Sequence, residues 1–238
     1  MLAARRTDRL EKLAAELTAG GTHVLTARCD VTVDGDPEKV TAAAHDRFGR
    51  VDTVVANAGF GVVGPFMLLD VADYRRQFET NVFGVLRTLK ATLPEVRRVR
   101  GRIAIIGSVS GHIATPGSSP YAMSKFAVRA LAEALGHELA RSGVSVTLVS
   151  PGYVQSEIRR VDNQGVLRDA TPDPVPAFFV MSTARAARQI ARAIARRRRE
   201  VVITGHGKVG VFFQRHAPWL VSAVIRRFGV RSRGEPAR

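Results

Sequence analysis

The sequence predicts an α/β protein with a parallel sheet covered by helices on both faces, a doubly wound architecture. Short apolar segments alternate along the chain with longer stretches of helical periodicity, which is typical of βαβ units. Polar or glycine-containing motifs directly follow four of the apolar segments, and doubly wound sheets bind ligands at this end of their strands. The 238 residues suffice for one or two domains with a sizeable core.

The first helix is predicted over residues 8–19, where leucines recur at helical spacing and Asp8 with Glu11 has the spacing of a capping box. We then expect, in chain order, strand His23–Ala27, helix Pro37–Phe48, strand Val51–Ala56, helix Tyr74–Val99, strand Arg102–Ile106, helix Ser119–Arg141, strand Val144–Val149, helix Thr183–Arg197 and strand Glu200–Thr204. Residues 152–181 form a long irregular stretch, and such loops are usually functional in compact domains. The expected division is a domain over 1–204 and a tail over 205–238.

Composition excludes several classes of protein. The chain is 45% hydrophobic and 6% aromatic and has one cysteine, which excludes a disordered chain, an intrachain disulfide and a cysteine-based zinc cluster. The six histidines have no metal-ligand spacing, so no metal site is expected. No apolar run approaches the roughly 20 residues that span a bilayer, and the first residues lack the apolar core of a signal peptide. The expected location is the cytoplasm.

The net charge of +15 is concentrated near the C-terminus. Fourteen basic and two acidic residues lie between Arg185 and Arg238, a net +12, so the first 184 residues carry only +3. The tail over 205–238 mixes aromatic, aliphatic and basic residues around Pro218, a pattern typical of an interfacial membrane anchor. The tail alternatively covers the substrate loop or packs against a second subunit. No recognition-helix, RNA-binding or zinc-finger motif accompanies the charge, so no specific nucleic-acid partner is expected.

The most informative pair is Tyr121 and Lys125, which lie four residues apart on one face of a predicted helix. A lysine ammonium beside a phenol favours the phenolate, so we expect a lowered Tyr121 pKa and a usable general acid or base. Ser108 follows a predicted strand thirteen residues before Tyr121, and Asn81 lies in the preceding long helix. A helix tyrosine and a solvated lysine are the plainer interpretation of the pair taken alone.

Together these residues resemble the classical short-chain dehydrogenase/reductases, over about residues 1–204. The resemblance rests on Asn57-Ala58-Gly59 after the strand 51–56, on a catalytic tetrad of Asn81, Ser108, Tyr121 and Lys125, and on Pro151-Gly152 after the strand 144–149. It implies a Rossmann-like fold and reversible hydride transfer between a nicotinamide and a carbonyl or alcohol. Tyr121 then exchanges the proton, Ser108 holds the substrate oxygen, Lys125 holds the nicotinamide ribose and Asn81 supports a water-mediated proton relay.

The resemblance also implies cofactor contacts. These are Arg5, Arg6, Asp30, Val31, Asn57, Ala58, Gly59, Tyr121, Lys125, Pro151, Gly152, Val154 and Ser156. Members that prefer NADP(H) carry basic residues after their second strand, where a guanidinium pairs with the 2′-phosphate. Arg5 and Arg6 stand there without an acid, which favours NADP(H), with NAD(H) as the alternative.

The sequence departs from the family pattern at its N-terminus. The family begins with a strand, a glycine-rich turn that cradles the pyrophosphate and a helix, and none of these precedes Leu2–Ala4 here. We therefore expect an N-terminally truncated sheet with a gap beside the strand 51–56. A start site placed too far downstream is the favoured explanation.

Two functions remain open at this stage. The first is an NADP(H)-dependent oxidoreductase acting on an apolar carbonyl or alcohol, because Phe178, Phe179 and Val180 lie in the variable loop. The alternative is a catalytically incompetent relative that binds partners or a membrane through its basic tail. The family is often dimeric or tetrameric, so a homo-oligomer is also expected.

Overall fold

The structure is a computed structural model that describes residues 1–167 and 175–228. Its strands are β1 (Leu2–Ala4), β2 (Thr26–Arg28), β3 (Thr53–Ala56), β4 (Arg102–Ile106), β5 (Ser145–Ser150) and β6 (Glu200–Val202). Its α-helices are α1 (Thr7–Ala19), α2 (Asp36–Phe48), α3 (Val71–Phe78), α4 (Gly84–Arg98), α5 (Ser119–Glu138), α6 (Thr183–Ala195), α7 (Gly205–His216) and α8 (Pro218–Phe228). The predicted alternation of strands and helices is thus confirmed.

Six short helical turns complete the described structure. They are η1 (Phe66–Leu68), the π-helical turn η2 (Glu79–Phe83), η3 (Val109–Gly111), η4 (Ala140–Ser142), η5 (Glu157–Arg160) and η6 (Ala177–Phe179). Three of them, η1, η5 and η6, lie in the connections that follow β3 and β5, so these connections carry most of the irregular structure.

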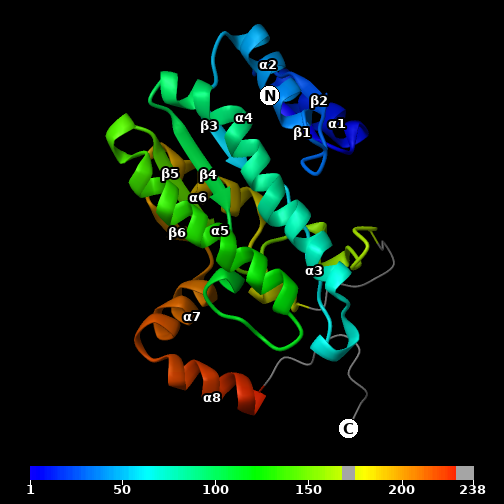
Figure 1. The fold of residues 1–238 in the computed structure, drawn as a ribbon, viewed down its shortest axis with the longest axis vertical. Coiled ribbons are helices and arrows are strands. Elements are labelled where there is room, and N and C mark those ends of the chain that lie inside the picture. Colours follow the sequence, from blue (N-terminus) through cyan, green and yellow to red (C-terminus); the bar gives the residue numbers. More distant parts are fainter. Residues whose placement is uncertain (168–174, 229–238) are drawn as a thin grey trace.

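Every strand pairing is parallel, and the strands form two separate sheets. β3, β4, β5 and β6 pair in that order, whereas β1 pairs only with β2. The two sheets are not hydrogen-bonded to each other within the described residues. Figure 1 shows β1, β2, α1 and α2 as a distinct group at the end of the molecule that holds the N-terminus.

The main core lies between the four-stranded sheet and helices α4 and α5. Val85, Leu89 and Val96 of α4 meet Ile103 and Ile105 of β4, and all five side chains are buried. Helix α5 adds Val128 and packs on β5, whereas α6 covers the opposite face of the sheet through contacts with β4 and β5. The sheet is therefore covered on both faces, as predicted.

The helix predicted over Tyr74–Val99 is confirmed as a continuous helical stretch, within which the π-helical turn η2 separates α3 from α4 and aims Asn81 into the interior. Two local predictions were wrong. Helix α1 begins at Thr7 after Arg6 and has no side-chain cap, so Asp8 and Glu11 form no capping box. The strand predicted over His23–Ala27 is the short β2, because only Thr26–Arg28 pair with β1.

The tail forms two helices separated near Pro218, which begins α8. Helix α7 packs on the domain through buried Gly207 and Val211, and Arg215 donates two hydrogen bonds to the Glu200 carboxylate, at 2.8 and 2.6 Å. Helix α8 packs mainly against α7. No helix of the described residues is long and apolar enough to cross a membrane.

Candidate active site

Ser108 and Tyr121 meet at the carboxyl end of β4. Ser108 directly precedes η3 in an extended conformation, and its hydroxyl accepts a hydrogen bond from the Ser110 backbone N–H at 3.1 Å. The Tyr121 side chain comes from the first turn of α5 and hydrogen-bonds Ser108. The strand end and the helix start therefore bring together two hydroxyl groups that are thirteen residues apart.

Lys125 is buried one turn beyond Tyr121, with 5% of its surface exposed. Its ammonium donates to the Ile106 backbone carbonyl at 2.9 Å and lies 5.7 Å from the centre of the Tyr121 ring. Burial lowers the pKa of the Lys125 ammonium to about 8, because the charged form loses its hydration.

The expected lowering of the Tyr121 pKa is wrong for this arrangement. Burial raises the pKa of the phenol above its usual value and outweighs the lowering by the hydrogen bond with Ser108. Tyr121 is therefore a protonated phenol near neutral pH, in the form that can donate a proton to a substrate oxygen.

Asn81 joins the loop after β3 to helix α5. Its side-chain oxygen accepts from the Phe60 N–H at 3.1 Å, and its amide nitrogen donates to the Phe60 carbonyl and to the Ser124 hydroxyl, both at 3.0 Å. Ser124 in turn donates to the Tyr121 carbonyl at 2.7 Å. The π-helical turn η2 makes these bonds available, and π-turns often occur at functional sites.

The Asn57-Ala58-Gly59 motif is exposed beside this group. A Cβ atom on Gly59 would lie 3.0 Å from the Asn81 side-chain oxygen and 3.7 Å from the Lys125 ammonium nitrogen. A Cβ on Gly61 would lie 3.6 Å from the Tyr121 ring. The backbone of this loop therefore runs directly over the predicted tetrad.

Pro151 and Gly152 directly follow β5, and Pro151 contacts the residue after Ser108. The Pro151 carbonyl accepts from the Val109 N–H at 2.8 Å, and Gly152 lies so close to Thr204 and His206 that a Cβ there would clash with both. Val154 forms a parallel bridge with Met181 at the base of the loop, whereas Ser156 is exposed. Part of the predicted loop, residues 168–174 with Pro172 and Pro174, lies outside the described residues.

The other predicted cofactor residues lie on or beside the small sheet. Val31 packs on Gly84 at the start of α4, and the Asp30 carboxylate accepts from Thr32 and lies 3.9 Å from the Arg5 guanidinium. Burial tends to raise the Asp30 pKa, but the Thr32 hydrogen bonds and nearby arginines hold it below its usual value.

The Arg6 side chain is already paired. Arg6 and Arg9 donate to the carboxylate of Glu157, at 3.0 and 2.6 Å, and Glu157 belongs to η5 in the loop after β5. The hydrogen bond from Arg9 and the further one from Arg6 hold the pKa of Glu157 below its usual value. This ion pair links the small sheet to the loop that borders the site.

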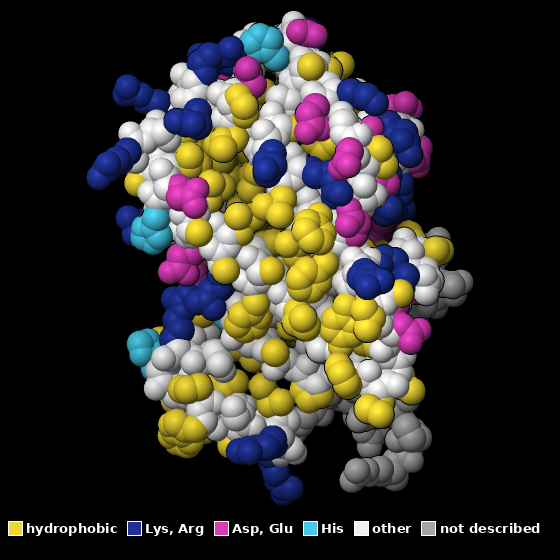
Figure 2. Space-filling model, in the orientation of Figure 1, with side chains coloured by type: hydrophobic (Ala, Val, Ile, Leu, Met, Phe, Trp, Pro, Cys, Tyr) yellow, Lys and Arg dark blue, Asp and Glu magenta, His cyan; other side chains and the backbone are white. Residues whose placement is uncertain are grey.

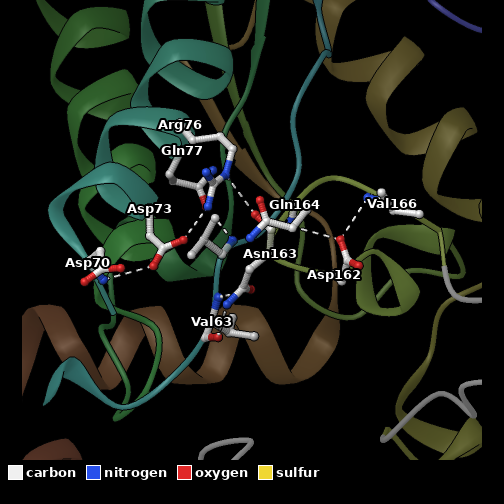
Figure 3. A network of polar contacts seen from close by, with 10 residues as sticks. Val63, Asp70, Asp73, Arg76, Gln77, Asp162, Asn163, Gln164 and Val166 are labelled. Carbon is white, nitrogen blue, oxygen red and sulfur yellow. Dashed lines mark hydrogen bonds and ion pairs between the residues drawn. The ribbon is translucent and has the colours of Figure 1, made fainter. Parts of the chain in front are cut away.

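Sequence reasoning missed one polar group, drawn in Figure 3. The Asn163 amide donates to the Val63 carbonyl at 2.9 Å, its oxygen accepts from the Val63 N–H at 3.0 Å, and Arg76 donates to the Asn163 carbonyl at 3.0 Å. Arg76 is itself paired with Asp73. Asn163 stands in an irregular loop with no motif around it, so no local pattern signalled this contact.

Residues 1–166 match the short chain dehydrogenase family. This chain belongs to that family. Its members are NAD(P)-dependent oxidoreductases, so the fold and the residue motifs agree with the match.

Relatives with assigned names are oxidoreductases. The chain is 34% identical to oxidoreductase UcpA of Salmonella typhimurium, over 78% of this chain and 70% of the relative. It is 32% identical to 11-beta-hydroxysteroid dehydrogenase A of Sesamum indicum, over 100% of this chain and 70% of the relative.

Solved short-chain dehydrogenases have the same fold. The alcohol dehydrogenase of Thermococcus sibiricus, complexed with 5-hydroxy-NADP, has a TM-score of 0.73 at 28% identity and covers 85% of this chain and 84% of its own. A short-chain dehydrogenase of Streptomyces avermitilis has a TM-score of 0.74 at 28% identity, over 95% and 85%. Among the described residues of this short-chain dehydrogenase, no three His, Cys, Asp or Glu side chains converge as metal ligands.

Proposed function

We propose that this short-chain dehydrogenase interconverts an apolar carbonyl compound and its alcohol with NADP(H) as cofactor. The observation that carries the proposal is the hydrogen bond between the Ser108 and Tyr121 side chains, with the Lys125 ammonium 5.7 Å from the Tyr121 ring. The two hydroxyl groups then face one point, where a substrate oxygen would bind, and the buried Lys125 ammonium lies behind them.

The residues divide the work of carbonyl reduction between them. The Ser108 hydroxyl donates a hydrogen bond to the substrate oxygen, and the protonated Tyr121 phenol transfers its proton to that oxygen as the carbonyl is reduced. In alcohol oxidation Tyr121 takes the proton back. A bound nicotinamide supplies the hydride for reduction and accepts it for oxidation.

Lys125 and Asn81 act behind this pair. The Lys125 ammonium holds the nicotinamide ribose and favours the phenolate that Tyr121 becomes after proton transfer. Asn81 holds the loop over the site through Phe60 and supports replacement of the lost proton through water. Its bond to Ser124 also fixes the first turn of α5, which carries Tyr121.

The described residues fit both ends of such a cofactor. Gly59 leaves open the space in front of Asn81 and Lys125 that any side chain would fill, which suits a nicotinamide ribose. At the other end, Arg6 and Arg9 already hold one anion, the Glu157 carboxylate, and Arg5 stands beside them with 61% of its side chain exposed. No glycine-rich turn stands between these ends among the described residues.

The arginines support NADP(H) over NAD(H). A 2′-phosphate carries more negative charge than a carboxylate and pairs with guanidinium groups through short, strong hydrogen bonds. The solved relative from Thermococcus sibiricus was complexed with 5-hydroxy-NADP, and a gluconate 5-dehydrogenase of Burkholderia cenocepacia, 27% identical with a TM-score of 0.63, with NADP.

Exposed apolar side chains beside the site support an apolar substrate. Phe178 and Phe179 stack in η6 of the loop after β5, with ring centres 4.4 Å apart, and Phe178 is 82% exposed. On the connection after β3, Phe66, Met67 and Leu68 are also exposed. Apolar side chains exposed together mark ligand or interaction surfaces.

The test has two steps. NADPH and NADH are titrated against the protein by fluorescence, and oxidation of the bound cofactor is then followed with apolar ketones and aldehydes, including a steroid ketone, and with polar sugars as controls. The proposal expects tighter binding of NADPH than of NADH and turnover of apolar compounds. Absence of NADPH binding would instead support a catalytically incompetent relative.

A further inference from the structure

Helices α7 and α8 form a hairpin whose outer surface has no partner in the described chain. Helix α7 is anchored by buried Gly207 and Val211 and by the pairing of Arg215 with Glu200. Helix α8 rests mainly on α7 and has no buried side chain among its described residues. The hairpin is therefore fixed at its base and open along α8.

This open surface is rich in large apolar side chains. Trp219 is 72% exposed, and the other exposed members of the hairpin surface are Val209, Phe212, Phe213, Leu220 and Val224. Figure 2 shows hydrophobic side chains grouped over the lower part of the molecule, where α7 and α8 lie, with Lys and Arg at its lower margin. Exposure of apolar area to water is unfavourable in free energy, and large exposed apolar patches usually mark interaction sites. We therefore expect the hairpin surface to bind an apolar partner.

The charge of the hairpin selects the kind of partner. Residues 205–228 contain four basic residues and no acidic residue. Arg226 and Arg227 are exposed in the last turn of α8 and pair with no described acidic side chain. An exposed tryptophan beside unpaired arginines is typical of helices that lie at the interface of anionic membranes.

We propose that the hairpin surface of α7 and α8 docks on an anionic lipid membrane. Helix α8 has 11 residues and is about 17 Å long, whereas the hydrocarbon core of a bilayer is about 30 Å thick. The helix therefore lies along the interface, with its apolar side chains in the lipid and its arginines at the phosphates. A second copy of the chain fits the surface less well, because two hairpins would bring together the cations Lys208, Arg226 and Arg227 of both copies, six like charges.

The hairpin also contacts the loop after β5, which borders the candidate site. The rings of Tyr153 and Phe179 pack on His206 at the start of α7, and the Tyr153 N–H donates to His206 at 3.2 Å. The docked hairpin thus brings the loop after β5 to the lipid surface. If the proposed reaction on apolar substrates holds, those substrates reach the site from the membrane.

The chain contains one tryptophan, so the fluorescence of Trp219 reports on α8 alone. The experiment mixes the purified protein with vesicles of phosphatidylcholine, with and without phosphatidylglycerol, and measures the Trp219 emission and the protein that floats with the vesicles. We expect a blue shift and flotation with the anionic vesicles, both reduced by salt. This test measures binding, so it is independent of whether the proposed reaction occurs.

Two variants and matched controls locate the contact. Val224→Glu places a charge in the apolar surface, and Leu13→Glu does the same on α1, where Leu13 is 42% exposed against 48% for Val224. Arg226→Glu with Arg227→Glu reverses the charge of α8, and Lys12→Glu with Arg141→Glu reverses two exposed charges elsewhere. We expect the α8 changes to weaken binding at least about thirtyfold and the controls to leave it unchanged.

Three results would overturn the proposal. One is a Trp219 emission that anionic vesicles do not shift. Another is a blue shift that depends on protein concentration without vesicles, which would assign the surface to a second copy. The third is equal loss of binding in the α8 variants and their controls, with circular dichroism confirming that each variant is folded.

Discussion

The side-chain amide of Asn163 pairs with both backbone polar groups of Val63, at 2.9 Å to the carbonyl and 3.0 Å to the N–H. The two residues are one hundred positions apart, and the pair joins the loop after β5 to the loop after β3. Arg76 adds a third bond to the Asn163 backbone. The loop after β3 lies against Tyr121 at Gly61, so we expect the pair to fix the position of this loop beside the candidate site.

Asn163→Ala should loosen this junction without altering the tetrad. Loss of the two hydrogen bonds leaves the Val63 N–H and carbonyl unpaired and should lower the free energy of unfolding by about 1–3 kcal/mol. Because the loop after β3 is then held less firmly, we expect the KM for an apolar carbonyl to rise several-fold while kcat changes little. Steady-state kinetics measures both values. Gln164→Ala is the matched control, because Gln164 is exposed and uses only its backbone N–H, toward Asp162. An equal effect of both changes would contradict the role of Asn163.

Arg5→Ser should weaken NADPH more than NADH. Arg5 is the most exposed member of the arginine group and has only a 3.9 Å ion pair with Asp30, so its guanidinium is available to a 2′-phosphate. Loss of a charge-assisted hydrogen bond of about 1.5–3 kcal/mol predicts a rise of roughly ten- to hundredfold in the Kd for NADPH. Fluorescence titration of both cofactors measures this, with Arg141→Ser as the control. An equal rise in the Kd for NADH would contradict the assignment of Arg5 to the 2′-phosphate.

Glu157→Gln should have the opposite effect. The change keeps the shape of the side chain but removes the charge that the Arg6 guanidinium neutralises, so Arg6 becomes more available to a phosphate. We expect the Kd for NADPH to fall by roughly threefold to tenfold and the Kd for NADH to stay the same. Weaker NADPH binding in this variant would show that Glu157 positions the arginines instead of competing for them.

Lys125 makes stability depend on pH. Its pKa is about 8 in the folded chain and 10.5 as the ordinary value, so the unfolded chain binds more protons between these values and stability rises with pH. Because the raised pKa values of Cys29 and Tyr121 oppose this from about pH 9 upward, the useful range is about pH 8 to 9, over which the gain is up to about 1 kcal/mol.

Urea unfolding across this range should show the gain in the wild-type protein and lose it in Lys125→Met. Lys12→Met, which removes an exposed lysine of α1, is the control and should keep it. An equal rise with pH in the Lys125 variant would assign the effect to other groups.

Local sequence patterns predicted the four strands of the larger sheet and the approach of Ser108, Tyr121 and Lys125. Arg102–Ile106 is a strand with the bounds predicted. A short apolar run between two helices is typical of a buried strand in a parallel sheet. Ser108, Tyr121 and Lys125 meet because a strand end and a helix start fix their positions.

Local sequence patterns could not predict contacts between side chains that lie far apart in the chain. The pairing of Arg6 with Glu157 and of Asn163 with Val63 depends on how two loops approach, which no local spacing encodes. The π-helical turn at Asn81 adds one residue to a helix whose apolar spacing reads as regular. The predicted lowering of the Tyr121 pKa was wrong for a related reason. The sequence places Lys125 close to Tyr121 but does not show how deeply the phenol is buried, and burial raises its pKa.

Tyr121→Phe tests the central claim most directly. The change removes only the phenol oxygen, so NADPH binding and the unfolding midpoint should stay as in the wild-type protein. Turnover of an apolar carbonyl should fall by at least about a hundredfold, because proton transfer by a positioned group contributes about that much. Turnover that survives the change in a folded, NADPH-binding protein would contradict the assignment of Tyr121 as the proton donor, and with it the proposed reaction at this site.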